Sequence, residues 1–203
     1  MRYEQFISKW AHEYTKHGIS DGSNLPDMDL YMDQMVTVLN DELSIYADEE
    51  GGPLTKSIVS NYTKHKMIPG PDGKRYTKLH MMFTLMVFYL KGGLSMDQIE
   101  RLVKPTLANF DSEWDDQVDI SAMYKEIVDF VTKSEEGFEE AVEKRVQDVK
   151  SFIAEKDQDD DISEITMLIM SMILRSNAER FLAEKLLDEY FPDPKKKGAK
   201  KKK

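Results

Sequence analysis

Apolar residues recur every three or four positions along most of this 203-residue chain, and this spacing constrains the fold more than any other feature. In the expected helix 136–156, the repeating positions are Phe138, Val142, Val146, Val149 and Ile153. A period near 3.6 places such residues on one face of an α-helix. The expected helix 162–190 carries a broader apolar face. The pattern therefore predicts a mainly α-helical protein whose second half is entirely helical.

Capping residues and turn formers set the expected helix boundaries. The predicted helices are a short one within 1–19, then Asp29–Ser44, one from Thr55 to Lys66, Lys78–Lys91, one from Ser95 that stops before Pro105, 119–133, 136–156 and 162–190. Asp27 or Asp29 is the expected cap of the second helix, and Thr55 that of the third. Ser95 with Gln98 is the expected capping box of the fifth, and Asp161 with Glu164 that of the last. Lys74 to Tyr76 is predicted to be extended and to form a small hairpin with Met67 and Ile68.

Several function classes are excluded or disfavoured by residue usage. The chain has no cysteine, which excludes disulfides, Cys-ligated zinc, iron–sulfur clusters and thiol nucleophiles. Its four histidines show no metalloprotease or triad motif, and no glycine-rich phosphate loop is present. We therefore expect no catalytic residues, no metal and no cofactor. Met1 to Trp10 lacks a signal-peptide core, and Met81 to Leu90 is too short to span a membrane, so a cytoplasmic protein without membrane contact is expected.

The charge is unevenly distributed. The net charge is −10, yet residues 53–91 carry seven Lys and Arg against one acid, and the tail 195–203 carries seven lysines and no acid. The other 155 residues are left with −23. Binding to a polyanion is decided locally, within a Debye length of about 8–10 Å. The basic segment is compatible with nucleic-acid binding and equally with an ordinary solvated basic face.

On a helical wheel of residues 54–65, two faces separate. Leu54, Ile58, Tyr62 and His65 form the face expected to pack inward. The opposite face carries Lys56, Ser57, Ser60, Thr63 and Lys64, with Asn61 on the flank. Lys, Ser and Asn side chains suit contacts to base edges and phosphates in a DNA major groove. A plain surface helix with polar residues outward would show the same wheel.

The order of elements matches a winged helix-turn-helix, with a helix before the basic helix and a Pro/Gly turn carrying Lys74-Arg75-Tyr76 after it. The stretch SIVSNYTKHKMIPGPDGKRYTKLHMMFTLMVFYLKGGLSMDQIERLV resembles the DNA-binding domain of MerR-type regulators. Tyr62 matches the family's tyrosine, residues 66–69 the segment before the wing, and residues 93–99 the closing Gly-Leu-Ser motif. The resemblance implies a MerR-like winged helix-turn-helix followed by an all-helical region.

The fuller pattern is closer to an uncharacterised bacterial family, domain of unknown function 1836, through residues 29–34 and 54–57. The implied division is an N-terminal extension at 1–26, the winged helix-turn-helix domain at 27–110, a helical dimerisation or signal region at 111–192 and a disordered Lys-rich tail at 193–203. The absence of cysteine departs from metal-sensing MerR-type proteins. The acidic loop 48–53 would lie near DNA, where it would either weaken binding or mark a helix-turn-helix that has been repurposed for protein contact.

Two functions remain open after this comparison. The first is a transcriptional regulator that binds double-stranded DNA as a homodimer, the dimer being inferred from the wide apolar face of 162–190. Its DNA-binding residues would be Lys56, Ser57, Ser60, Asn61, Tyr62, Lys64, Lys74, Arg75, Tyr76 and Lys78. The second is a non-catalytic adaptor that keeps the fold without binding DNA and contacts a protein partner through its helical C-terminal region.

Overall fold

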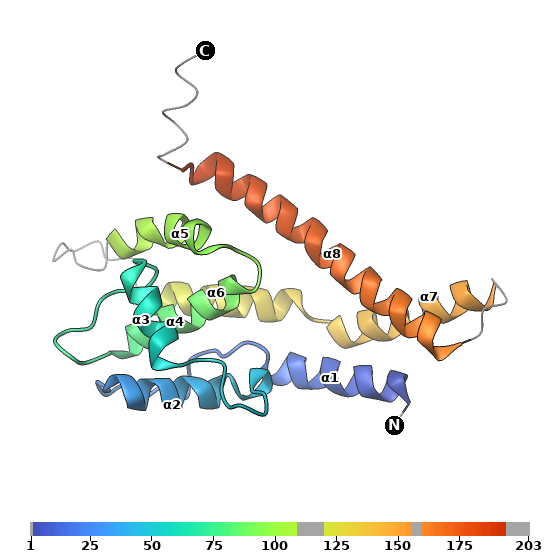
Figure 1. Cartoon of the computed structure of the whole chain (residues 1–203), viewed down its shortest axis with the longest axis horizontal. Helices are drawn as coiled ribbons and strands as arrows, with labels where there is room; N and C mark the ends of the chain where they lie inside the picture. The colour runs from blue at the N-terminus through green and yellow to red at the C-terminus, as the bar shows by residue number, and fades with distance from the viewer. Residues whose placement is uncertain (1, 109–119, 156–159, 194–203) are drawn as a thin grey trace, which may run out of the picture.

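The computed structural model describes residues 2–108, 120–155 and 160–193 (Figure 1). Most of the predicted Lys-rich tail and the charged segment 157–159 lie outside these residues. The described helices are α1 (Tyr3–His17), α2 (Met32–Glu42), the 3-10 turn η1 (Ser44–Tyr46), α3 (Lys56–Lys64), α4 (Lys78–Lys91), α5 (Met96–Ala108), α6 (Ile120–Ser134), α7 (Phe138–Ala154) and α8 (Asp161–Tyr190). The described residues contain no β-strand, only isolated bridges. The prediction of a mainly helical fold is confirmed.

Helix α4 is the centre of the main hydrophobic core. It is apolar on nearly every side, and Met81, Phe83, Leu85 and Val87 are completely buried. A helix of this composition must be covered all round, and α2, α3, α5 and α6 pack against it. Burial of so many large side chains makes α4 the rigid support on which the shorter helices are held.

The described helices pack around two hydrophobic cores. Tyr124 and Val128 of α6 belong to the core around α4. A second, smaller core joins α7 and α8, where Val146 and Leu168 are buried. Ile7 of α1 packs against this second core, so α1 lies beside α7 (Figure 1).

Polar contacts fasten α1 to α7 and α8. The Tyr3 hydroxyl donates to the carboxylate of buried Glu164 on α8, and Lys150 of α7 pairs with Glu4. Asp161 with Glu164 was expected to form the capping box of α8, but the cap is Asp160, which accepts a hydrogen bond from the Ser163 N–H at 2.8 Å. The chain enters the helix one residue earlier than predicted, which leaves Glu164 free to turn inward and accept from Tyr3.

Tyrosine hydroxyls hold the segment between α1 and α2 against the main core. Tyr46 donates to the Gly18 carbonyl at 2.7 Å, and Tyr124 donates to the Ser20 carbonyl at 2.7 Å. The hydroxyl of Tyr89 accepts from the Ser20 N–H at 2.8 Å. Burial raises the pKa of Tyr89 to about 12, so this phenol stays protonated at neutral pH. The two cores are thereby joined by an ordered connection.

Two helix boundaries differ from the predictions. Helix α5 continues through Pro105 to Ala108. Pro105 costs the helix one backbone hydrogen bond and crowds the carbonyl four residues earlier, yet only three residues of α5 follow it, so the proline lies in the last turn. Helix α2 begins at Met32 and not at Asp29, because Leu30 is extended and exchanges two backbone hydrogen bonds of 2.9 Å with Tyr76.

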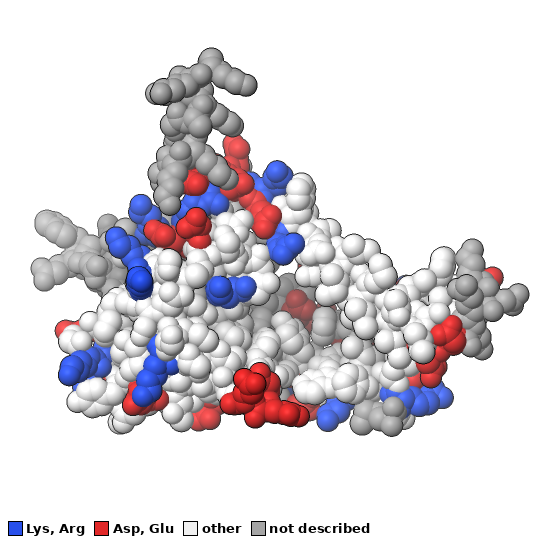
Figure 2. All heavy atoms as spheres, in the orientation of Figure 1, with Lys and Arg blue, Asp and Glu red and all other residues white. Residues whose placement is uncertain are grey.

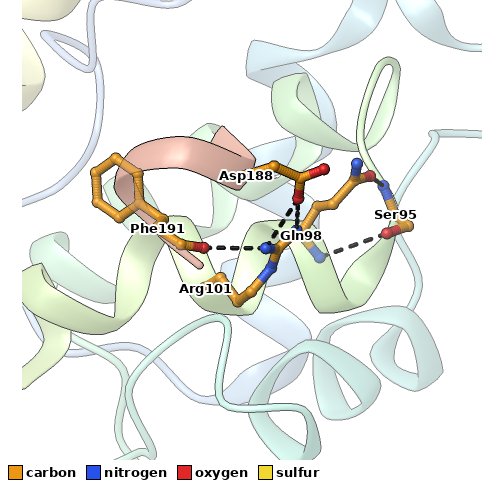
Figure 3. Close-up of polar contacts among 5 residues, drawn as sticks. All are labelled: Ser95, Gln98, Arg101, Asp188 and Phe191. Carbon is orange, nitrogen blue, oxygen red and sulfur yellow. Dashed lines mark hydrogen bonds and ion pairs between the residues drawn. The ribbon is translucent and has the colours of Figure 1, made fainter. Parts of the chain in front are cut away.

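Helix α8 connects the two cores along one edge of the molecule (Figure 1). Its first turns pack on α7, and its C-terminal end reaches α5. There Arg101, whose side chain is only 15% exposed, donates to Asp188 at 3.0 and 3.1 Å and to the Phe191 carbonyl at 3.0 Å (Figure 3). The same view shows the predicted Ser95–Gln98 capping box of α5, with the Ser95 N–H donating to Gln98 at 2.8 Å.

Candidate nucleic-acid interface

The outer face of α3 is polar and exposed. Lys56, Ser57, Ser60, Asn61 and Lys64 all lie on the surface. Four of them, together with half-buried Ile58, line an open hollow of about 330 Å³. Beneath this face Val59 is completely buried and Tyr62 is 5% exposed. The helix therefore presents a continuous row of hydrogen-bonding side chains from a packed base.

The inward face of α3 differs from the one predicted on the helical wheel. Leu54 and Tyr62 are buried as predicted, whereas Ile58 is only half-buried and His65 is exposed. Val59, which the wheel did not place on this face, is completely buried. The helix starts at Lys56 and ends at Lys64, so neither Leu54 nor His65 belongs to its regular part. Within the helix the buried direction passes through Val59 and Tyr62 and not through Ile58.

Two side chains position the start of α3. The Thr55 hydroxyl accepts from the Ile58 N–H at 3.2 Å, a standard N-cap. The Asn40 side chain of α2 makes two hydrogen bonds to Leu54, each of 2.9 Å: its Oδ1 accepts from the Leu54 N–H, and its Nδ2 donates to the Leu54 carbonyl. A Cβ at Gly52 would lie 2.3 Å from the Asn40 side chain. This close approach favours glycine at position 52. The two hydrogen bonds of Asn40 then hold the start of α3 against α2.

A tight turn lies where the wing was predicted and packs against the segment just before α2, where Arg75 contacts Tyr31. Asp72 and Arg75 exchange two backbone hydrogen bonds of 3.1 and 2.9 Å, and Gly73 between them has a φ of +58°. The predicted hairpin with residues 67–68 is wrong, because Tyr76 pairs with Leu30. Leu30 and Tyr76 are both buried, so their side chains anchor this pairing in the core. Lys74 and Arg75 are left exposed at the turn.

His80 joins this turn region to α4. Its Nε2 donates to the Gly70 carbonyl at 2.8 Å, and its Nδ1 accepts from the Thr77 N–H at 3.1 Å. These partners assign the tautomer with hydrogen on Nε2. The ring is 2% exposed and packs edge-on against Tyr76. His80 thus supports the turn from below and lies apart from the exposed polar face.

Three of the expected DNA-contacting cations are held by neighbouring groups. Lys56 Nζ lies 2.6 Å from an Asp33 carboxylate oxygen, and Lys78 Nζ lies 2.8 Å from Asp27. The Arg75 guanidinium stacks on the exposed ring of Tyr31, 4.0 Å from its centroid. Figure 2 accordingly shows Lys and Arg interspersed with Asp and Glu, not gathered in one basic field.

The ten predicted site residues fall into two groups. Eight side chains reach the surface around α3, the turn and the start of α4, where Lys78 is half-buried. Tyr62 and Tyr76 are each only 5% exposed and form part of the core. Burial also raises the pKa of both phenols. These two tyrosines support the surface from beneath.

Sequence reasoning missed the acids that pair with the lysines. The sequence indicated only a helix-capping role for Asp27, because its ion-pair partner Lys78 lies 51 positions further along the chain. No local pattern connects residues so far apart. The one available signal was the group of acids in residues 27–33, which lies in the helix before the basic helix.

Comparison with known proteins identifies the family. Residues 21–127 match the family described as domain of unknown function (DUF1836). The chain belongs to this family. The matched range ends within α6, which agrees with the packing of α6 in the main core. No curated protein and no solved structure matches the chain.

None of the described helices is long and apolar enough to cross a membrane.

Proposed function

We propose that this DUF1836 protein is a DNA-binding transcriptional regulator of the MerR-like winged helix-turn-helix type, acting as a homodimer. The observation that carries the proposal is the exposed row on α3, from Lys56 to Lys64, above buried Val59 and Tyr62. A rigid helix with outward Lys, Ser and Asn side chains can enter a major groove and contact base edges.

The surroundings of α3 support this role. Helix α2 precedes it as the first helix of a helix-turn-helix would, and Asn40 holds the two together. The turn 72–75 exposes Lys74 and Arg75, and Arg75 stacks on Tyr31, two residues before the Asp33 that pairs with Lys56 of α3. A wing that contacts phosphates would lie in such a position. Ser57, Ser60 and Asn61 would read bases, whereas Lys56, Lys64 and Lys78 would approach the backbone.

The adaptor function has a specific observation in its favour. Asp33 and Asp27 already neutralise Lys56 and Lys78, and their carboxylates would repel DNA phosphates. A surface with balanced charges suits a protein partner at least as well as DNA. In that case the exposed apolar face of α8 would contact the partner.

Binding titrations at several salt concentrations separate the two functions. A regulator shows salt-dependent binding: for each phosphate neutralised, log K falls by about 0.9 per tenfold increase in salt concentration. Genome-wide capture of its bound DNA gives discrete peaks. In that protein, Asn61→Ala changes base preference at one position, by about 1–3 kcal/mol, whereas Arg75→Ala weakens all sequences equally and lowers the salt slope by about one. Wild-type protein without salt-sensitive DNA binding would refute the regulator.

A further inference from the structure

The C-terminal end of α8 is fixed to α5, the helix whose first residue contacts α3. The Arg101 guanidinium of α5 donates to the Asp188 carboxylate and to the Phe191 carbonyl, the latter at 3.0 Å (Figure 3). Phe191 is the residue that terminates α8, and the described part of the chain ends two positions later, at Asp193. The point at which the chain leaves α8 is therefore set by a contact with α5.

The other end of α5 touches the exposed row on α3. The Asn61 side-chain nitrogen donates to the Met96 sulfur at 3.8 Å, and Met96 is the first residue of α5. Met96 and Arg101 are five positions apart, which corresponds to a rise of about 7.5 Å along the helix. Figure 1 shows α5 between α3 and the C-terminal end of α8 in this view. A short stretch of helix, with a side-chain contact at each end, thus connects the row on α3 to the end of α8.

The residues that follow Asp193 are strongly basic. Residues 194–203, PKKKGAKKKK, carry seven lysines and no acid, and we call them the lysine segment. Ten residues span up to about 33–36 Å when extended. This reach exceeds the rise between Arg101 and Met96 several times over, so the segment is long enough to pass α5 and meet a duplex held by α3.

We propose that the lysine segment is a second DNA-binding element, which contacts the phosphate backbone of the same duplex that α3 reads. The inference rests on the proposed function and adds a phosphate-binding element to it. Arg101 is a positioning residue, because its contacts fix where the segment begins. Lysine binds phosphate as a flexible point charge, so the segment adds affinity and salt dependence but carries no sequence information.

The charges around α3 give this element a clear contribution. Lys56 and Lys78 already have Asp33 and Asp27 as partners, and these acids would oppose the approach of phosphates. The lysine segment has no acid of its own. Seven neutralised phosphates would add up to about 6 to the slope of log K against log salt. Attachment beside α3 also raises the effective concentration of the segment at the bound duplex to about the millimolar range.

Salt titrations of full-length proteins test the proposal. The probe is a short duplex that carries a site obtained by genome-wide capture. Changing all seven lysines of the segment to Gln should weaken binding about tenfold or more near 0.1 M salt and reduce the salt slope by about 3–6. Changing the same seven lysines to Arg is the matched control and should keep both values, because the charge is retained. Preference for the captured site over a scrambled duplex should be the same in all three proteins.

Addition of a free peptide with the sequence of the segment tests the attachment. At micromolar concentration the peptide should not restore the affinity of the Gln variant, because it lacks the effective concentration that the covalent link supplies. Full restoration by the free peptide would overturn the proposal that the exit point beside α5 matters.

Directed DNA cleavage tests where the segment lies, since the natural chain has no cysteine. An iron chelate attached to Ala199→Cys should cut the backbone at a few positions beside the captured site. The same chelate on Gln147→Cys, an exposed position of α7, is the control and should give no cuts above background. Arg101→Gln and the milder Asp188→Asn should spread the cuts of the Ala199→Cys protein over more positions while the salt slope stays unchanged, because the lysines remain but their starting point is released.

The outcomes separate this inference from the proposed function. If wild type binds the captured site but the Gln variant has the same affinity and salt slope, or binds more tightly, the lysine segment does not contact DNA and only this inference is overturned. Cuts from Ala199→Cys that do not exceed those of the Gln147→Cys control would overturn it as well. Wild-type protein that binds no DNA would refute the proposed function and this inference together.

Discussion

The ion pair between Asp33 and Lys56 leads to a quantitative prediction about DNA binding. The two side chains are 69% and 64% exposed and 2.6 Å apart, and an exposed pair of this kind contributes about 0–1 kcal/mol. In the proposed complex Lys56 leaves this partner for DNA. The Asp33 carboxylate then lies near phosphates, where one like charge about 8 Å away costs about 0.5 kcal/mol in water.

Asp33→Asn removes both the competing pair and the repulsion while keeping the size of the side chain. DNA binding should strengthen by about 1 kcal/mol per half-site, or about 2 kcal/mol for a dimer, a gain of about 30-fold. Asp41→Asn, an exposed carboxylate on the same helix, is the control.

Fluorescence anisotropy with one duplex at several salt concentrations measures this change. The gain should shrink as salt increases, because screening weakens both effects. An unchanged or weaker affinity for Asp33→Asn would refute the reasoning: it would mean that Asp33 positions Lys56 for binding or that α3 does not contact DNA.

Three further predictions concern stability. Asn40→Ala should lower the free energy of unfolding by about 1–3 kcal/mol in denaturant titrations, because both backbone groups of Leu54 lose their partner. Tyr62→Ala should cost about 3–5 kcal/mol in the same measurement, since a buried aromatic ring is removed. The hydrogen bonds from Ser163 lower the pKa of Asp160; the stability from this cap is present above the ordinary pKa and is lost as pH falls through the lowered one. Thermal melts between about pH 2 and 6 should show a shallower acid decline for Asp160→Asn than for wild type.

Most of the helical architecture could be predicted from local sequence. Thr55 caps α3, and Ser95 with Gln98 caps α5, as the sequence indicated, because a cap depends on residues within one turn. The apolar period of residues 138–153 likewise marked the buried side of α7, where Val142, Val146, Val149 and Ile153 are all buried. The match to domain of unknown function 1836 was also apparent from short motifs in order.

Tertiary structure decided which of those elements meet. The sequence determined that the chain is helical and that residues 54–65 have a polar face, since these properties depend on neighbours in the chain. It could not show that α1 packs on α7, that Tyr76 pairs with Leu30 or that Asp27 holds Lys78. Those contacts join residues 46 or more positions apart, and the packing of whole helices, not any local preference, brings them together.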